Sequence, residues 1–217
     1  MCGRYSLDKP KQLRFRFDTE NDIDVLPQYD IRPSQELPVI INKEHTTLEI
    51  MRWGLIPFWA KEAKIGYKMI NARAETVATL ASYKKPFRFQ RCLVPASGFY
   101  EWKTMGKEKK RYYFHRKDDE LFAFAGVYDT WRDPQGKEIQ SYTIITTTPN
   151  TTVGAVHDRM PVMLTKEQEK LWLDPDITEP ERLQPLLRSY PDAEMEAYPV
   201  SSIIESAENI KPPLNSA

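Results

Sequence analysis

Short stretches of alternating or β-branched hydrophobic residues recur along the chain and predict a β-rich fold. The first two of these stretches are joined around Lys43-Glu44-His45, a polar turn in which His45 is expected to be exposed. Gly and Pro residues separate most of the others, as expected of turns and loops. The pattern predicts strands over residues 38–42, 48–53, 92–103, 111–115, 121–131, 141–148 and 195–200.

Helical spacing of hydrophobic residues is limited to shorter segments. In the helix predicted over residues 9–17, Leu13 and Phe17 are expected to point inward. In the helix predicted over 165–173, Thr165 and Gln168 have the spacing of a capping box, in which each side chain bonds the backbone of the other residue. Pro185 is expected to interrupt the helix predicted over 179–190. The pattern predicts helices over residues 9–17, 75–82, 165–173 and 179–190.

The order of these elements indicates one domain. Strands and helices follow each other without a repeating unit, and no linker or low-complexity segment divides them, which favours a single α+β domain over residues 1–200. Residues 18–36 are polar, contain two prolines, and are expected to form a loop. Residues 201–217, with Pro212-Pro213, are expected to form a loose tail.

Composition narrows the class of protein. The 217 residues suffice for one sizeable core, and 12% aromatic residues add buried area to a hydrophobic fraction of 41%. No apolar run approaches about 20 residues and no signal peptide is recognisable, so we expect a cytoplasmic protein without membrane contact. Cys2 and Cys92 are expected to be free thiols. With three histidines and no metal-ligand spacing, we expect neither a metal nor a cofactor.

Charge is distributed unevenly although the net charge is zero. Residues 1–116 hold 22 Lys and Arg against 13 Asp and Glu, whereas residues 117–217 hold 9 against 18. Aromatic residues accompany the basic ones over 84–91 and gather again over 52–60, a pattern typical of grooves that track a single nucleic-acid strand. Each observation also has an alternative explanation. The charge difference is expected if an acidic face balances a basic one within one fold. The basic run over 84–91 is expected of a solvated surface helix, and the aromatic residues over 52–60 are expected if they pack in the core.

Cys2 carries the most specific chemistry. If Met1 is removed, Cys2 presents an α-amine and a thiol on adjacent carbons, which together convert an aldehyde first to an imine and then to a five-membered thiazolidine. The α-amine has a reference pKa of about 7.7–8.0, against about 10.4 for lysine, so far more of it is deprotonated at neutral pH. Most cysteines at position 2 of a protein have no such function, so other parts of the chain have to support this interpretation.

A few other residues invite a chemical or a structural interpretation. By strand alternation Glu101 shares a face with Phe99, which places it either at a wet strand edge or in a pocket that perturbs its pKa. Cys92 is expected to be a small buried hydrophobe. His115 is expected to face solvent from its strand. His157 stands between apolar residues and two charges, which in isolation favours a structural role.

Five motifs follow one another along the chain. They are Met1-Cys2-Gly3-Arg4-Tyr5, Trp-Gly-Leu-Ile-Pro-Phe-Trp-Ala over 53–60, Asn-Ala-Arg-Ala-Glu over 71–75, Gly-Phe-Tyr-Glu-Trp over 98–102 and His-Asp-Arg-Met-Pro over 157–161. In this order they resemble the motifs of the SRAP (SOS response-associated peptidase) family, from residue 2 to about residue 200. The resemblance implies a β-rich, barrel-like SRAP fold with surrounding helices and a basic groove for DNA. It also implies covalent trapping of abasic sites in single-stranded DNA as a thiazolidine.

The resemblance also implies roles for single residues. Cys2 is the nucleophile, Asn71 holds the reacting group by hydrogen bonds, Glu101 is the acid/base residue near the imine, and His157 assists proton transfer to the sugar. One part of the chain departs from the family pattern, because Ile203-Ile204-Glu205 stands where members usually show a Val-Asn pair, and this puts a role of the tail in doubt. The implied DNA-binding residues are Arg4, Arg73 and Arg159 on phosphates, with Trp53, Trp59, Lys85 and Arg88 lining the path.

Two other functions compete with the trap. Cys2, His157 and Asn71 would also make the nucleophile, base and orienting residue of a thiol peptidase, whose activity could be limited to removal of Met1. The basic and aromatic runs alone would suit a binder of single-stranded nucleic acid without catalysis. For the trap we expect a monomer that associates with the nucleoid when bound to DNA, and a weak lyase side reaction.

Overall fold

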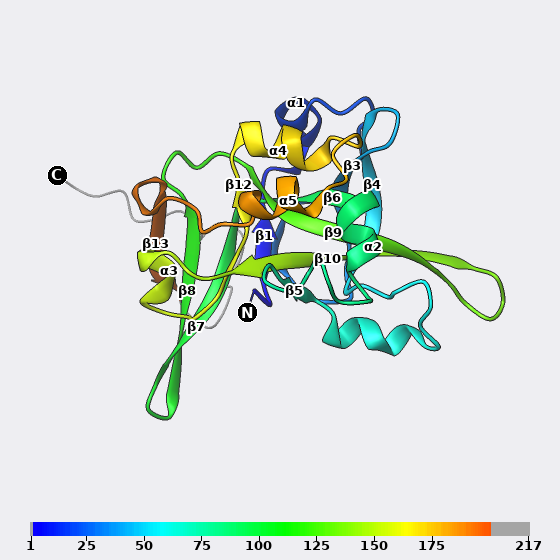
Figure 1. Ribbon diagram of the computed structural model, residues 1–217. Coiled ribbons are helices and arrows are strands. Elements are labelled where there is room, and N and C mark those ends of the chain that lie inside the picture. The colour runs from blue at the N-terminus through cyan, green and yellow to red at the C-terminus, as the bar shows by residue number, and fades with distance from the viewer. Residues whose placement is uncertain (1, 201–217) are drawn as a thin grey trace.

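The computed structural model of the protein describes residues 2–200 (Figure 1). The predicted tail over 201–217 lies outside the described residues. Within them, the strands of one sheet close on themselves, because β10 pairs with β9 on one side and with β4 on the other. The remaining pairings join β4 to β3, β3 to β6 and β6 to β9. This barrel consists of β3 (Glu36–Asn42), β4 (Thr46–Trp53), β6 (Arg91–Ala96), β9 (Phe122–Arg132) and β10 (Glu138–Thr147).

A second sheet lies beside the barrel and is antiparallel throughout. Its strands, in spatial order, are β13 (Met195–Val200), β8 (Glu108–Arg116), β7 (Gly98–Met105), β1 (Tyr5–Leu7) and β2 (Gln28–Ile31). Three short strands add to the barrel sheet: β5 (Asn71–Arg73) beside β10, β11 (Met160–Pro161) beside β10, and β12 (Met163–Leu164) beside β9. The predicted β-rich α+β architecture is therefore confirmed.

Short helices surround the strands, and α1 and α4 lie together at one side of the barrel, where Arg16 of α1 donates two hydrogen bonds to Glu169 of α4 (Figure 1). The hairpins β7–β8 and β9–β10 project away from the body in different directions. Among residues 2–200, no helix is long and apolar enough to cross a membrane. The helical elements are η1 (Pro10–Gln12), α1 (Leu13–Phe17), η2 (Ala63–Lys68), α2 (Lys84–Phe89), α3 (Thr151–Gly154), α4 (Lys166–Leu173), α5 (Pro180–Leu183), η3 (Gln184–Leu186) and η4 (Asp192–Glu194).

The predicted helices were correct where a capping signal or an inward face specified them. The capping box of Thr165 and Gln168 opens α4, and Leu13 and Phe17 are buried in α1. The helix predicted over 75–82 is wrong, since this stretch forms successive turns and helix begins only at α2. Its β-branched Thr and Val residues lose side-chain freedom in a helix, and nothing caps its start. The last predicted helix ends early, at residue 186.

The strand predicted over 92–103 is divided at Ser97, and this division positions the candidate site. β6 belongs to the barrel, whereas β7 belongs to the second sheet, so the chain changes sheet at Ser97. The hydroxyl of Ser97 bonds Asp8 and its backbone N–H donates to Ser6, which ties the crossing point to β1. The predicted loop over 18–36 also contains a strand, β2, whose pairing with β1 local sequence did not reveal.

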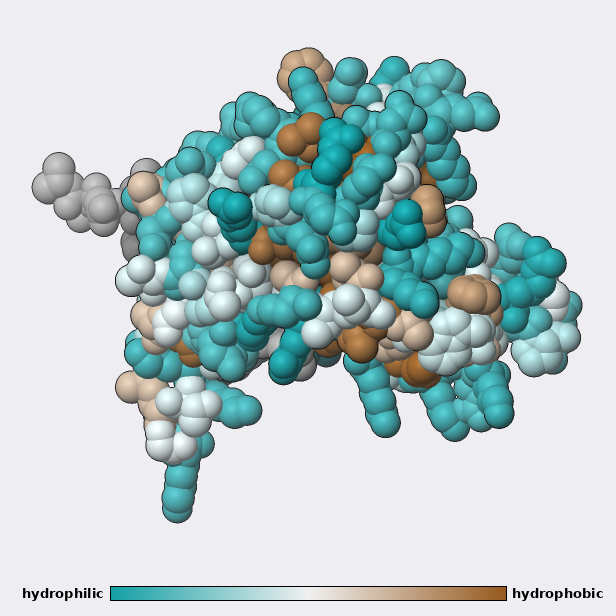
Figure 2. All heavy atoms as spheres, in the orientation of Figure 1, coloured by the Kyte–Doolittle hydropathy of each residue, from teal (hydrophilic) through white to brown (hydrophobic). Residues whose placement is uncertain are grey.

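The core fills the barrel and the space beneath the second sheet. Cys92 is fully buried there, as predicted. His45 lies exposed in its turn, also as predicted. The expectation that His115 faces solvent is wrong, since it is buried and stacks on Tyr113 with 5.6 Å between ring centroids. Hydrophilic side chains cover most of the face shown in Figure 2, with small hydrophobic areas between them.

Candidate active site

Cys2 is enclosed at the junction of the barrel and the second sheet. Its side chain is fully buried, and its Sγ lies 3.9 Å from the carbonyl oxygen of Arg4. Burial, with a further contribution from the negative charge of Glu101, raises the pKa of the Cys2 thiol well above its ordinary value. The thiol therefore stays protonated at neutral pH and is a poor nucleophile until another group draws it into reaction.

Asn71 fixes the start of the chain from the barrel side. It opens β5, which runs parallel to β10 with Asn71 opposite Ile144. The side-chain nitrogen of Asn71 donates a hydrogen bond of 2.9 Å to the carbonyl oxygen of Cys2. The structure thus brings together two residues that are far apart in sequence and were both expected at the site.

Glu101 reaches the same region from the second sheet. It lies on β7, shares the inward face with buried Phe99, and is only 3% exposed. Burial raises the pKa of Glu101 above its ordinary value, although the nearby His157 acts in the opposite direction. A carboxyl group that keeps its proton more readily than usual is suited to act as a general acid.

His157 stands 3.8 Å from Glu101, measured between Nε2 and Oε2. Its Nδ1 accepts a hydrogen bond of 3.0 Å from the backbone N–H of Arg159 and also lies 2.9 Å from a carboxylate oxygen of Asp158. The Asp158 side chain is exposed. The backbone donor and the carboxylate thus both lie at Nδ1, and Nε2 is the nitrogen that faces Glu101.

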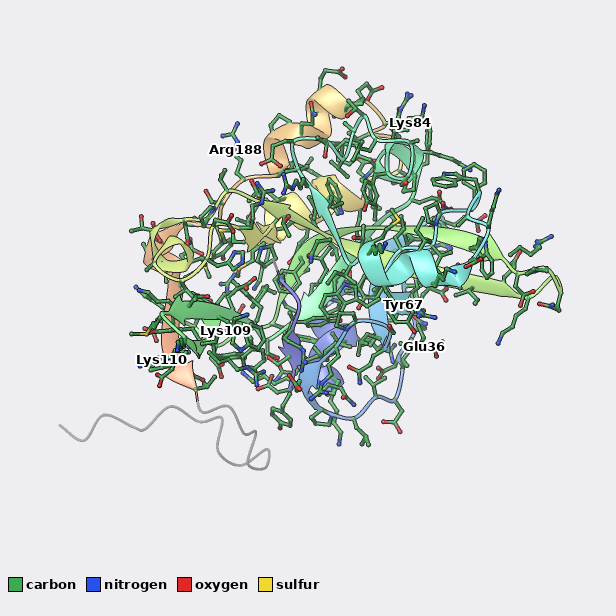
Figure 3. The ribbon with its side chains drawn as sticks, turned by 90° about the horizontal axis from the view of Figure 1, so that it is seen from below. Glu36, Tyr67, Lys84, Lys109, Lys110 and Arg188 are labelled. Carbon is green, nitrogen blue, oxygen red and sulfur yellow. The ribbon has the colours of Figure 1, made fainter. Side chains whose placement is uncertain are left out.

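A pocket of about 370 Å³ opens beside this pair. Glu101 and His157 form one part of its lining, and Trp102, Thr104 and Lys109 of the β7–β8 hairpin form the other. The sequence analysis did not assign these last three residues to the site. A basic stretch over 107–110 was the available signal, and Figure 3 shows Lys109 on the hairpin, at the opposite end of the view from Tyr67.

Two of the predicted DNA contacts, Arg4 and Arg159, form ion pairs within the protein. Arg4 pairs with Asp30 at 2.7 Å. Arg159 forms two hydrogen bonds with Glu75, of 2.6 and 2.9 Å, and these bonds lower the pKa of that carboxyl. Arg73, at the end of β5, is exposed. Their contact with phosphates stays a prediction.

Trp59, Lys85 and Arg88 belong to a separate cluster built by α2 and the segment over 57–60. Trp59 is exposed, and the ammonium group of Lys85 lies 4.9 Å from the ring centroid of the neighbouring Phe58. Arg88 donates to the carbonyl oxygen of Thr178. The cluster has the aromatic and basic character that a strand-binding surface needs, and its role in binding stays a prediction.

The prediction that Trp53 lines the DNA path is wrong for the folded protein. Its side chain is 1% exposed, its ring packs edge-on against Tyr5 with centroids 5.1 Å apart, and its indole N–H donates to the carbonyl oxygen of Ile70. A residue enclosed in this way cannot stack on a base. It ends β4 as part of the barrel core, which is the alternative that aromatic clustering in the sequence had left open.

A closed barrel and a second sheet enclose Cys2, whose carbonyl oxygen Asn71 holds, and this arrangement defines the class as a β-barrel domain. Within residues 2–200 no group of His, Cys, Asp and Glu is placed to hold a metal ion. A family model described as "SOS response associated peptidase (SRAP)" matches residues 1–207. The chain therefore belongs to the SRAP family.

Similar proteins cover nearly the whole chain. "Abasic site processing protein YoqW" of Bacillus subtilis is 47% identical over 222 residues, which cover 99% of this chain and 98% of that protein. "Abasic site processing protein HMCES" of Xenopus tropicalis is 33% identical over 218 residues, covering 86% of this chain and 64% of that protein. A crystal structure of a protein from Bacteroides thetaiotaomicron matches with a TM-score of 0.87 at 30% identity, over 93% of each chain.

Proposed function

We propose that the protein traps abasic sites in single-stranded DNA covalently, through a thiazolidine formed by Cys2 after removal of Met1. The observation that carries the proposal is that buried Cys2 is held by Asn71 and feels the charge of Glu101, which lines a pocket together with His157. The names of the relatives, which specify abasic site processing, support the same substrate.

The reaction balances with the groups in place. An abasic deoxyribose is mostly a closed hemiacetal, and ring opening removes a proton from its hydroxyl and supplies one to the ring oxygen. The α-amine of Cys2 then adds to the aldehyde carbon, and loss of water gives the imine. Finally the sulfur bonds the imine carbon and the thiol proton passes to nitrogen. Aldehyde and aminothiol thus give thiazolidine and one water, without redox change.

The environment of each group suits its step. The imidazole of His157 can both donate and accept a proton, which suits proton exchange with the sugar. Glu101, whose pKa burial raises, supplies the proton that helps water leave. The raised thiol pKa of Cys2 delays attack by sulfur until the imine has formed. Asn71 holds the Cys2 backbone while these steps occur.

The finer parts of the proposal concern processing and substrate form. Met1 leaves through an aminopeptidase or through a single self-cleavage, and the product acts as a monomer on one strand. An imine at an abasic site is also an intermediate for β-elimination, so slow strand cleavage accompanies trapping when ring closure is delayed. The buried, protonated thiol is unfavourable for a thiol peptidase, which needs a thiolate or a base that removes the thiol proton.

The test is incubation with an oligonucleotide that carries one abasic site, followed by a denaturing gel. The processed protein is expected to give a band that survives denaturation, and Cys2→Ala is expected to give none. Intact mass of the purified protein shows beforehand whether Met1 is absent. Mass spectrometry of the digested conjugate is expected to place the nucleotide remnant on Cys2, and a remnant on any other residue would contradict the mechanism.

Acetylation of the α-amine separates the competing functions. The trap loses activity because the amine forms the imine, whereas a thiolate that attacks a peptide bond does not need a free amine. A binding module without catalysis gives no band with any variant and binds equally well as Cys2→Ala.

A further inference from the structure

One carboxylate of the second sheet receives three guanidinium groups. Oδ2 of Asp30 lies 2.7 Å from Arg4 and 2.7 Å from Arg32, and its Oδ1 lies 3.0 Å from Arg111. Among residues 2–200, none of the three arginines pairs with a second carboxylate. The cluster, which we call the Asp30 cluster, therefore carries two positive charges more than its single acid neutralises.

The arginines of the Asp30 cluster differ in exposure, from a buried one to one at the surface. Arg111 is 7% exposed, and its guanidinium lies 3.7 Å from the ring centroid of Tyr100, so it forms the floor. The side chain of Arg32, 62% exposed, forms the outer edge. Although burial acts to raise the pKa of Asp30, hydrogen bonds from Arg32 and Arg4 bring it below its ordinary value. The carboxylate thus stays ionised and keeps the cations assembled.

Hydrogen-bond donors remain available at the outer edge. A guanidinium offers five N–H donors in a planar fork that matches phosphate oxygens. Arg4 uses only one of its terminal nitrogens on Asp30, and Arg32 uses Nε and one terminal nitrogen. An anion that approaches from solvent therefore finds unused donors on two adjacent forks, held in place by the shared carboxylate.

The position of the Asp30 cluster relates it to the reactive pocket. Arg4 is two residues from Cys2, and Arg111 lies 5.4 Å from the ring centroid of Trp102, on the neighbouring strand. Trp102 in turn lines the pocket with Glu101 and His157. An anion bound at the cluster is thus one side chain away from the place where the lesion would react.

We infer that the Asp30 cluster is a phosphodiester-binding site for the strand that carries the lesion, with Arg32 as an outer contact and Asp30 as the residue that positions the arginines. The inference rests on the proposed function in taking the anion to be a nucleic-acid strand. It goes beyond a single contact of Arg4, because the excess positive charge and the arrangement of donors belong to Arg4, Arg32 and Arg111 together. The unused donors of Arg4 and Arg32 bind the phosphate oxygens, and buried Arg111 adds its charge from below.

The test compares Arg32→Ala with Arg132→Ala. Arg132 is a matched control, 68% exposed and also paired with one carboxylate, that of Glu138, on the β9–β10 hairpin that projects away from β7–β8 (Figure 1). Affinity for an undamaged single-stranded oligonucleotide is measured by fluorescence anisotropy across a salt series. Arg32→Ala is expected to raise the Kd about five- to tenfold at low salt and to reduce the salt slope by about 0.7. Arg132→Ala is expected to leave both unchanged.

Equal Kd values and slopes for the two variants would overturn the inference. Asp30→Asn tests the positioning role. It removes a negative charge, which by itself would favour binding of an anion. It is nevertheless expected to raise the Kd, because the arginines lose the carboxylate that holds them in place. A lower Kd would overturn the role given to Asp30. The denaturing-gel assay separates the two proposals: a wild-type protein that binds the strand but forms no abasic adduct contradicts the proposed function alone.

Discussion

The side-chain amide of Asn71 holds the carbonyl oxygen of Cys2 through a hydrogen bond of 2.9 Å. Asn71 lies on β5, whose parallel pairing with β10 makes it part of the barrel. Its amide oxygen is buried and accepts no hydrogen bond within residues 2–200. A buried acceptor without a partner is costly. Asn71 thus makes one bond that fixes the Cys2 backbone, and its amide oxygen is left as an acceptor that the proposed reaction can use.

Substitution of Asn71 is therefore expected to impair chemistry more than binding. Asn71→Ala releases the Cys2 carbonyl, and misplacement of a reacting group by about 1 Å can cost roughly 100-fold in rate. We expect adduct formation at saturating protein to slow by about 10- to 100-fold, with the Kd for undamaged strand within about twofold of wild type. Single-turnover rates on denaturing gels check this. A variant as fast as wild type would remove Asn71 from the mechanism.

Glu101→Gln is expected to stabilise the fold at neutral pH. Burial raises the pKa of Glu101 above 4.5, so the folded state favours the protonated carboxyl. Stability from this group is fully present below its unfolded pKa and is lost as pH rises through the higher folded pKa. Glutamine resembles the protonated form at every pH. The gain in Tm should therefore be near zero at acidic pH and grow as pH rises.

Melting curves across a pH series test this expectation. Glu36→Gln is the control, because Glu36 is exposed at the start of β3 and lies away from Lys109 in Figure 3. Its Tm should follow that of wild type at each pH. The Glu101 variant should also lose most of its rate of adduct formation, because glutamine supplies no proton. A pH-independent difference in Tm would contradict burial of a titrating carboxyl.

His157 offers a prediction that depends on the form of the aldehyde. Its Nε2 faces Glu101, and in the proposed reaction it exchanges protons during ring opening of the sugar. General acid–base catalysis contributes about 100- to 10,000-fold, so His157→Ala should slow trapping of a natural abasic site by about 100-fold or more. An oligonucleotide with an acyclic aldehyde needs no ring opening and should lose much less. His45→Ala, in the exposed turn, should change neither rate. Equal losses on both substrates would place His157 in another step.

Local signals in the sequence predicted the elements that depend on neighbouring residues. The capping box of Thr165 and Gln168 predicted the start of α4, and alternation placed Glu101 on the same face as Phe99, which the structure shows to be buried. Closure of the barrel could not be predicted in this way, because it depends on β10 pairing with β4 and on β3 pairing with β6 across long sequence separations. The periodicity of hydrophobic residues does not indicate which strands pair with each other.

The errors at the candidate site have the same physical origin. The family resemblance places Trp53 on the DNA path, but the packing of Tyr5 against its ring encloses it. Asp30 falls in the loop predicted over 18–36, whereas pairing of β2 with β1 brings it to Arg4. His115 is covered by aromatic residues of its own sheet. In each case contacts between distant segments decided burial, and the family motifs indicated the reacting residues without indicating their surroundings.

Gly54 connects the barrel to the position of Asn71. Its φ is +118°, and an added Cβ would lie 2.5 Å from the carbonyl oxygen of Gly66 in η2. Real Cβ atoms do not approach backbone so closely, and the left-handed region is itself unfavourable for other residues. Next to Gly54, Leu55 bonds the carbonyl oxygen of Met69, two residues before Asn71. A displacement of η2 would therefore reach the residue that holds Cys2.

Gly54→Ala is accordingly expected to lower stability by about 2–4 kcal/mol and to slow adduct formation as well. Gly106→Ala is the matched control, because Gly106 also has a positive φ, of +63°, but an added Cβ there meets nothing within 4 Å. It should cost about 1 kcal/mol and leave the rate unchanged, since the tip of the β7–β8 hairpin has room. Chemical denaturation and single-turnover gels measure both quantities. Equal losses of stability would show that strain at φ alone, and not the close approach to Gly66, sets the requirement for glycine at position 54.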